Sequence, residues 1–248
     1  MSRAAQRVQL ARAYVLHRRP FRDTSLIVEL FAREHGRMTV FARAARGPRS
    51  RFALLQPFRP LLLSWCGRGE APQLTAAETA ESALSALPAE QLMSAFYLNE
   101  LLLTLTTRHD PHAQLFDYYE FTLAHLCRDV EPEGALRRFE ARLLEFIGYG
   151  LDLGTEADTG EPVRAEAYYR YQPGVHGVVA STPSARGAIC GRVLQGLVAA
   201  SVLSSEADLR QARVLMRAAI DHCLEGRELR TRVVARSLIS YPRRERNA

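Results

Sequence analysis

Apolar and polar residues alternate with a period of two along two neighbouring segments near the start of the chain. Successive side chains of a strand point to opposite faces, so every second residue belongs to one face. The turn between the two segments is Glu34-His35-Gly36, where the glycine permits a positive φ. The pattern predicts a β-hairpin whose buried face consists of Leu26, Val28, Leu30, Ala32, Met38, Val40 and Ala42.

Further short alternating runs, separated by turn residues, continue this strand-rich region to residue 80. Five short strands in so small a region are typical of a Greek-key barrel of the OB-fold type, which often binds oligonucleotides. An SH3-like barrel is the nearest alternative. The expected strands are 8–17, 25–33, 37–43, 56–66 and 73–80.

From residue 89 onward, apolar residues recur with the spacing of α-helices. Ser205 and Asp208 form a plausible capping arrangement at one helix start. The segment 149–187 is instead rich in glycine, proline and polar residues, and 168–181 within it can form a hairpin. The expected helices are 89–107, one that begins at Asp110-Pro111, 132–147, 184–203, 205–224 and 228–239.

These two patterns predict an α+β protein with two domains. We expect a small OB-fold β-barrel over residues 1–80 and an all-helical domain over 81–248, with a small irregular insertion at 149–187. A chain of 248 residues with 47% hydrophobic content can bury a core of this size.

Charge is segregated along the chain, and this indicates what the barrel binds. Residues 1–68 carry 14 arginines and 3 acidic residues, whereas 69–209 carry 9 arginines and 20 acidic residues. The remainder, 210–248, has 10 arginines and 4 acidic residues. A basic module beside an acidic one favours contact with a polyanion such as nucleic acid.

The densest basic segment runs from Arg33 to Arg51 and contains six arginines but only one carboxylate, Glu34. The outward face of the hairpin would also present Phe31 and Phe41 as platforms on which bases stack. The alternative is that these phenylalanines belong to the barrel core or pack beneath the other domain. The predicted nucleic-acid contacts are Arg33, Arg37, Phe41, Arg43, Arg46, Arg49 and Arg51.

The sequence contains few of the motifs that are typical of enzymes. All 33 basic residues are arginine, which excludes a phosphate-binding-loop lysine and a Schiff-base lysine. The four cysteines form no C-x-x-C pair, and no apolar run is long enough to span a membrane. We therefore expect a cytoplasmic, nucleoid-associated binding protein without catalytic residues, metal or cofactor. A two-metal nuclease with an OB-fold, or an RNA-binding module, is the alternative.

Several separated segments resemble the RecO family of bacterial DNA repair proteins across nearly the whole chain. They occur in the family's order: AYVLHRRPFRDTSLIVELFAREHGRMTVFARAARGPRSRF, LLQPFRPLLLSWCGRGE, FYLNELLLTL, LRRFEARLLEFIGYGL and LEGRELRTRVVARSLI. The resemblance implies an OB-fold followed by a helical domain. It further implies binding to single- and double-stranded DNA, annealing of complementary strands, and loading of RecA, together with RecR, onto DNA covered by single-strand-binding protein.

The chain departs from many members of that family in one respect. Those relatives carry a four-cysteine zinc site just after the segment that matches FIGYGL, whereas residues 154–158 contain no cysteine pair. The resemblance is therefore to the zinc-free members found among proteobacteria.

The helix expected at 132–147 carries three arginines within the acidic part of the chain. Arg138 and Arg142 are four residues apart and share a face, although they can simply pair with acids such as Glu133 or Glu145. The resemblance implies that the helical domain binds the acidic, phenylalanine-ended tail of single-strand-binding protein. Arg227 to Arg236 is the alternative docking region. The predicted docking residues are Arg137, Arg138 and Arg142.

Overall fold

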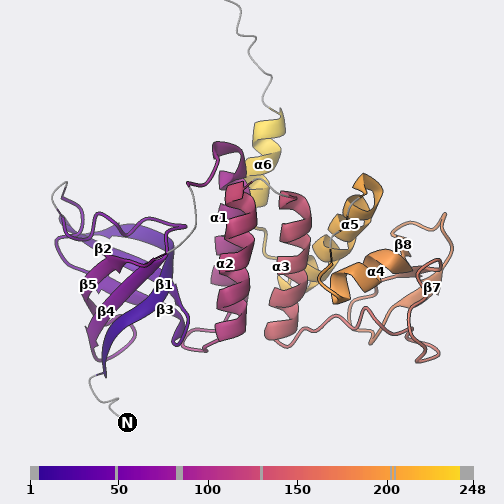
Figure 1. Ribbon diagram of the computed structural model, residues 1–248, viewed down its shortest axis with the longest axis horizontal. Helices are drawn as coiled ribbons and strands as arrows, with labels where there is room; N and C mark the ends of the chain where they lie inside the picture. The colour runs from indigo at the N-terminus through magenta and orange to yellow at the C-terminus, as the bar shows by residue number, and fades with distance from the viewer. Residues whose placement is uncertain are drawn as a thin grey trace, which may run out of the picture.

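The computed structural model describes residues 6–47, 50–81, 86–128, 131–201, 203 and 205–240. The N-terminal part is a closed barrel, drawn at the left of Figure 1. Five strands form it, which confirms the predicted OB-like class, although β1 extends farther in both directions than the alternation indicated. The strands are β1 (Gln6–Phe21), β2 (Ser25–Ala32), β3 (Gly36–Ala42), β4 (Leu61–Gly67) and β5 (Gln73–Thr79).

The strands follow the order β1-β2-β3-β5-β4 around the barrel. Strand β1 is long enough to pair antiparallel with β2 through its second half and with β4 through its first half. Closure occurs between β3 and β5, which run parallel, with Phe41 opposite Gln73. The amide of Phe41 donates to the carbonyl of Pro72 at 2.9 Å, next to this pairing.

The period-two pattern correctly predicted the interior of the barrel. All seven residues assigned to the buried face of the β2–β3 hairpin belong to the barrel core. Trp65 of β4, at 1% exposure, is the largest side chain in that core.

The C-terminal part is helical, and most of the predicted helices are present. Ser205 caps α5, because its Oγ accepts a hydrogen bond from the amide of Asp208 at 3.0 Å. The helix expected from 184 begins only at Gly191, because residues 184–190 form turns and a short strand. The elements are η1 (Ala89–Gln91), α1 (Leu92–Leu105), α2 (Ala113–Arg128), α3 (Pro132–Phe146), α4 (Gly191–Val198), α5 (Glu206–Cys223) and α6 (Arg230–Ser240).

The predicted insertion contains the expected hairpin, and a third strand extends it into a small sheet of order β7-β6-β8. Figure 1 shows this sheet at the end of the molecule opposite the barrel, with α1, α2 and α3 between them. Its strands are β6 (Tyr168–Arg170), β7 (Val179–Ser181) and β8 (Ile189–Cys190).

The barrel and the helices share a hydrophobic core, to which β1 and β2 contribute Tyr14, Leu16 and Phe31. Gly36, the first residue of β3, makes a close backbone approach to the helical part. It has a φ of +66°, and a Cβ atom there would lie 2.1 Å from the carbonyl oxygen of Asp110. The β2–β3 turn is therefore pressed against the loop between α1 and α2.

Candidate nucleic-acid interface

The β1–β2 turn and the loop after β3 meet at the end of the hairpin that lies away from the helices. The backbone amide of Arg46 donates to the carbonyl of Thr24 at 3.0 Å. Its guanidinium also donates to the carbonyls of Arg22 and Asp23, both at 3.1 Å. Residues separated by more than 20 positions in the chain thus form one surface.

We call this surface the arginine end. Its arginines are all exposed, and none of them forms an ion pair with a carboxylate within the described parts of the chain. Arg12, Arg33 and Arg108, which lie nearer the helices, each form an ion pair. The positive charge of the arginine end is therefore open to an anionic ligand. Its members are the exposed arginines of the last part of β1, the β1–β2 turn and the segment that follows β3: Arg18, Arg19, Arg22, Arg43, Arg46 and Arg51.

Two partly exposed aromatic rings lie within the arginine end. Phe21 and Phe41 pack edge to face, with ring centroids 5.4 Å apart and planes at 89°. The guanidinium carbon of Arg22 lies 5.3 Å from the centroid of Phe21. Aromatic faces among arginines suit a single strand, whose bases can stack while its phosphates contact the charges.

Phe31 does not belong to this surface, and its predicted role as a stacking platform is wrong. It is 0% exposed and packs against Phe116 and Tyr119 of α2, with centroid distances of 5.5 and 6.1 Å. The outward side of β2 is covered by a helix that is distant in sequence. Packing beneath the other domain was the alternative for this residue, and it is the one observed.

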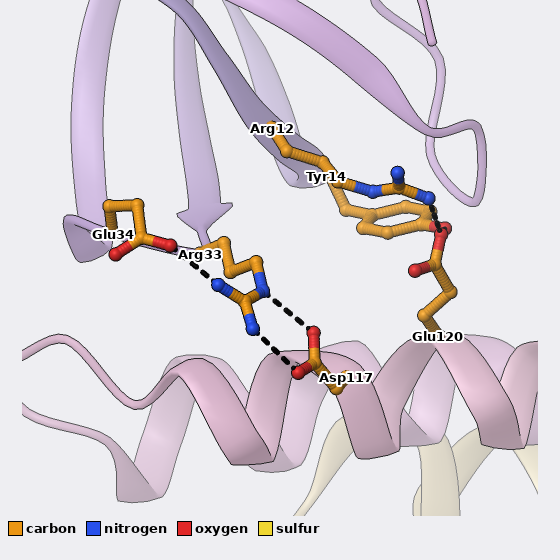
Figure 2. Close-up of polar contacts among 6 residues, drawn as sticks. All are labelled: Arg12, Tyr14, Arg33, Glu34, Asp117 and Glu120. Carbon is orange, nitrogen blue, oxygen red and sulfur yellow. Dashed lines mark hydrogen bonds and ion pairs between the residues drawn. The ribbon is translucent and has the colours of Figure 1, made fainter. Parts of the chain in front are cut away.

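Arg33 and Arg37 lie at the opposite end of the hairpin, against the helices. Arg33 makes a bidentate ion pair with Asp117 of α2, with both nitrogen–oxygen distances at 2.8 Å, and its third nitrogen contacts Glu34 (Figure 2). Arg37 donates to the carbonyl of Thr106 at 2.7 Å. The structure does not bring these two arginines together with Arg43, Arg46 and Arg51. Arg49, predicted for the same loop, lies outside the described residues.

A second polar contact joins the barrel to α2 beside the first (Figure 2). Glu120 accepts from Arg12 at 2.5 Å and from the hydroxyl of Tyr14 at 2.8 Å. Burial, followed by the hydrogen bond to Glu120, raises the pKa of Tyr14 far above its usual value. Tyr14 therefore stays a protonated donor, and the outer face of the barrel is held to the helices here.

The three arginines predicted for partner docking have separate surroundings. Arg138 is 4% exposed, and its guanidinium lies 3.2 Å from the carboxylate of Glu131. Arg142 forms an ion pair with Glu145, one of the two acidic residues that the sequence analysis gave as alternative partners. Arg137 contacts the buried Glu140 at 2.9 Å. Only Arg137 among the three lines the groove described next.

This groove, which we call the helical groove, lies between α1, α3, α5 and α6 and has a volume of about 270 Å³. Met93, Leu136 and Ala235 provide apolar walls. Arginines surround these walls: Arg137, Arg213, Arg217 and Arg232. Each of these arginines lies beside a carboxylate of Glu140, Glu133 or Asp221, so a ligand with both negative charge and an apolar group would compete with these ion pairs.

Sequence reasoning overlooked the part of the arginine end that β1 contributes. Arg18, Arg19, Phe21 and Arg22 form the run RRPFR, which mixes charge and an aromatic residue as clearly as the segment from Arg33 does. Pro20 within this run reads as a turn, whereas the structure continues β1 through it to Phe21.

No group of three or more histidine, cysteine or acidic side chains that could hold a metal ion occurs within the described ranges. None of the four cysteines forms a disulfide within the described residues. Of the helices that the structure describes, none has both the length and the apolar character needed to cross a membrane.

Comparison with known proteins gives consistent matches over both parts of the chain. The family described as "Recombination protein O N terminal" matches residues 7–83, and "Recombination protein O C terminal" matches 89–232. A DNA repair protein RecO from Alkalilimnicola ehrlichii is 46% identical over 243 residues, covering 97% of this chain and 96% of the relative. One from Methylococcus capsulatus is 45% identical over 232 residues, covering 93% and 94% respectively.

Proposed function

Since the chain belongs to the RecO family of DNA repair proteins, we propose that its barrel binds single- and double-stranded DNA and that it anneals complementary strands. The observation that carries this proposal is the arginine end, where exposed arginines without carboxylate partners among the described residues accompany the Phe21–Phe41 pair, and Arg22 lies against Phe21. Arginines there can neutralise the phosphates of two strands, which lowers the repulsion that opposes pairing.

The wider role follows from the family. We propose that the protein acts at the nucleoid in the cytoplasm. There, together with RecR, it would help to load RecA onto DNA covered by single-strand-binding protein. The proposed action is binding and exchange of partners, without chemical turnover, cofactor or metal.

The test uses two complementary labelled strands with Mg²⁺ present. We expect the protein to speed duplex formation and to leave every strand at its full length. Shortened strands would support the alternative, an OB-fold nuclease that uses metal ions. No acceleration at any protein concentration would contradict the annealing function.

RNA binding is the second alternative, and competition between strands of equal length and sequence addresses it. A protein that reads the 2′-hydroxyl prefers RNA. The arginine end offers charge and stacking, which both nucleic acids can use, so we expect DNA to compete at least as well as RNA. A clear preference for RNA would count against a repair function.

We further propose that the helical groove binds the acidic tail of single-strand-binding protein. An apolar terminal side chain would lie against Met93 and Leu136, and acidic residues would lie beside Arg213 and Arg217. This proposal keeps Arg137 from the sequence prediction and adds Arg232, which falls within the alternative region from Arg227 to Arg236.

A charge reversal at Arg217 tests the groove. The side chain of Arg217 is 60% exposed and lies 3.8 Å from Asp221. We expect Arg217→Glu to weaken binding of a tail peptide about tenfold or more, since it replaces attraction with repulsion beside an apolar site. Arg210→Glu, an equally exposed position on α5 outside the groove, is the matched control.

Titration with the tail peptide also distinguishes the helical groove from the face of α3 that carries Arg138 and Arg142, which the sequence suggested as the docking surface. Arg142→Glu should leave the affinity for the tail peptide unchanged. If Arg142→Glu abolishes binding and Arg217→Glu does not, the tail binds on the outer face of α3.

A further inference from the structure

A cavity of about 310 Å³ lies where the barrel meets the helical part, and none of the contacts above uses it. Its walls come from the β2–β3 turn, the end of β4, the β4–β5 loop and the loop between α1 and α2. Small-molecule sites range from about 300 to 1,000 Å³, so this cavity suits a single small ring system.

One wall of the cavity is aromatic. The rings of His35 and Trp65 pack edge to face, with centroids 5.0 Å apart. Trp65 is 1% exposed and therefore fixed in the barrel core, which also restricts the half-buried His35. At the side of the β4–β5 loop, Gly69 leaves open space, because no heavy atom lies within 4 Å of where its Cβ would be. A flat ligand that enters can lie against His35, because Trp65 is too deeply buried to offer it a face.

A polar atom without a hydrogen-bond partner borders the same cavity. Nε2 of His109 is buried and has no hydrogen bond to any described group, and the carboxylate of Glu70 lies 3.7 Å from it. The residue is held in place, because its amide donates to the carbonyl of Arg37 at 2.8 Å and its φ is +58°. A buried polar atom without a partner needs an explanation, and a bound ligand is one; strained backbone such as this left-handed residue clusters at ligand sites.

The cavity lies at the helix-facing end of the hairpin, and the β4–β5 loop connects it to β3 near Phe41. Pro72 lines the cavity, and its carbonyl accepts the hydrogen bond from the amide of Phe41. A strand that stacks on Phe41 and continues along the β4–β5 loop would reach the cavity, where a base can turn inward.

We propose that this cavity binds one unstacked base of a bound single strand. The inference rests on DNA binding by the barrel, as proposed above. A base is planar and carries donors and acceptors on its edge, which match His109 and the carboxylate of Glu70. Arg68 and Glu34 line the cavity and Glu70 lies beside His109, so charges of both signs are available to the polar edge of a base. Paired bases cannot enter, so the cavity favours single strands over duplex.

The experiment uses oligothymidines that carry one 2-aminopurine at successive positions, together with a duplex of equal length. With the parent protein, we expect a fluorescence change confined to one position of the probe. His109→Asn removes the imidazole and keeps a residue that tolerates a positive φ. It should abolish that signal and weaken single-strand binding roughly fivefold or more, as the loss of one stacked base does, without changing duplex affinity.

His112→Asn is the matched control, because His112 follows in the same loop, contacts Asp110 at 3.1 Å and does not line the cavity. It should behave as the parent does. His35→Ala removes part of the aromatic wall and should reproduce the loss independently, even if His109→Asn fails to fold. Retention of the positional signal in a folded cavity variant, or no positional signal in a parent that binds strands, overturns the inference. A parent that binds no DNA overturns the proposed function instead.

Discussion

Phe31 and Phe41 lie ten residues apart on paired strands, and their surroundings assign them different roles. Phe31 is 0% exposed in the shared core, whereas Phe41 is partly exposed beside Phe21 and the arginines. Both side chains point away from the barrel interior. What separates them is that α2 covers one end of the hairpin and leaves the other end open.

Alanine at each position should therefore give opposite results. Phe41→Ala should weaken single-strand binding by about 1 to 3 kcal/mol, the contribution of one stacked base, at a small loss of stability. Phe31→Ala should lower the free energy of unfolding by about 3 to 5 kcal/mol, as for a buried phenylalanine, without directly weakening binding. Thermal melting and DNA titration on the same samples measure both. A large loss of stability for Phe41→Ala would place that ring in the core instead.

The residues that sequence reasoning placed correctly are those governed by local periodicity. Leu26, Val28 and Met38 lie in the barrel core as alternation requires. Alternation identifies the outward residues equally well but cannot indicate what covers them. Arg33 forms an ion pair with Asp117, which lies 84 residues away in the sequence. Nothing in the sequence near either residue predicts this contact.

Among the elements, β1 contributes most to the candidate site through its last residues, which pair with the start of β2. Those residues and the loop after β3 together carry the exposed arginines. Since the β1–β2 turn and this loop are joined through Arg46, the positions of the charges depend on that contact as much as on the strands.

Removing three charges from the arginine end should change how binding depends on salt. Each phosphate contact with a single strand contributes about 0.7 to the slope of log K against log salt, so Arg19→Ala, Arg43→Ala and Arg51→Ala together should reduce it by about 2. Arg46 is left in place because its guanidinium supports the turn. Binding should weaken alike for all sequences, because phosphate contacts carry no sequence information.

A matched triple variant gives the comparison. Arg164, Arg170 and Arg186 are exposed in the insertion, at the far end of the molecule, and their replacement by alanine removes the same charge. An equal reduction of the slope in this control would mean that total charge, and not the arginine end, governs binding.

At the scale of the whole molecule, the barrel is fixed to the helices by a shared core and by ion pairs at its edge. The acidic residues of α2 are part of this: Asp117 and Glu120 face basic residues of the barrel (Figure 2). The segregation of charge seen in the sequence therefore serves attachment between the two parts as well as the proposed contact with DNA.

This attachment should depend on pH. The hydrogen bonds from Arg33 hold the pKa of Asp117 below its usual value, so the carboxylate contributes stability above that usual value. The contribution disappears as the pH falls through the lowered pKa. We expect Asp117→Asn to be less stable than the parent at pH 7, by about 1 kcal/mol or less because the pair is largely exposed. Denaturant unfolding at a series of pH values should show the two proteins converging in acid.

Asp158→Asn provides the control, since Asp158 is exposed in the insertion and makes no ion pair within the described chain. It should match the parent at every pH. A gap between Asp117→Asn and the parent that persists or widens in acid would show that the ion pair is not its cause.

The barrel closes along the β3–β5 pairing, at Phe41 and Gln73, beneath the surface proposed for DNA. A closed sheet must open somewhere for its interior amides to exchange hydrogen with water, and a short parallel pairing is the weakest place. The proposed DNA strand, lying across Phe41 and the β4–β5 loop, would bind the form in which this β3–β5 pairing is closed. Opening of the β3–β5 pairing and binding of DNA are then coupled, because DNA that binds the closed form shifts the equilibrium toward it. The amide hydrogen of Phe41 should exchange with water more slowly as the DNA concentration rises, so its exchange rate reports binding.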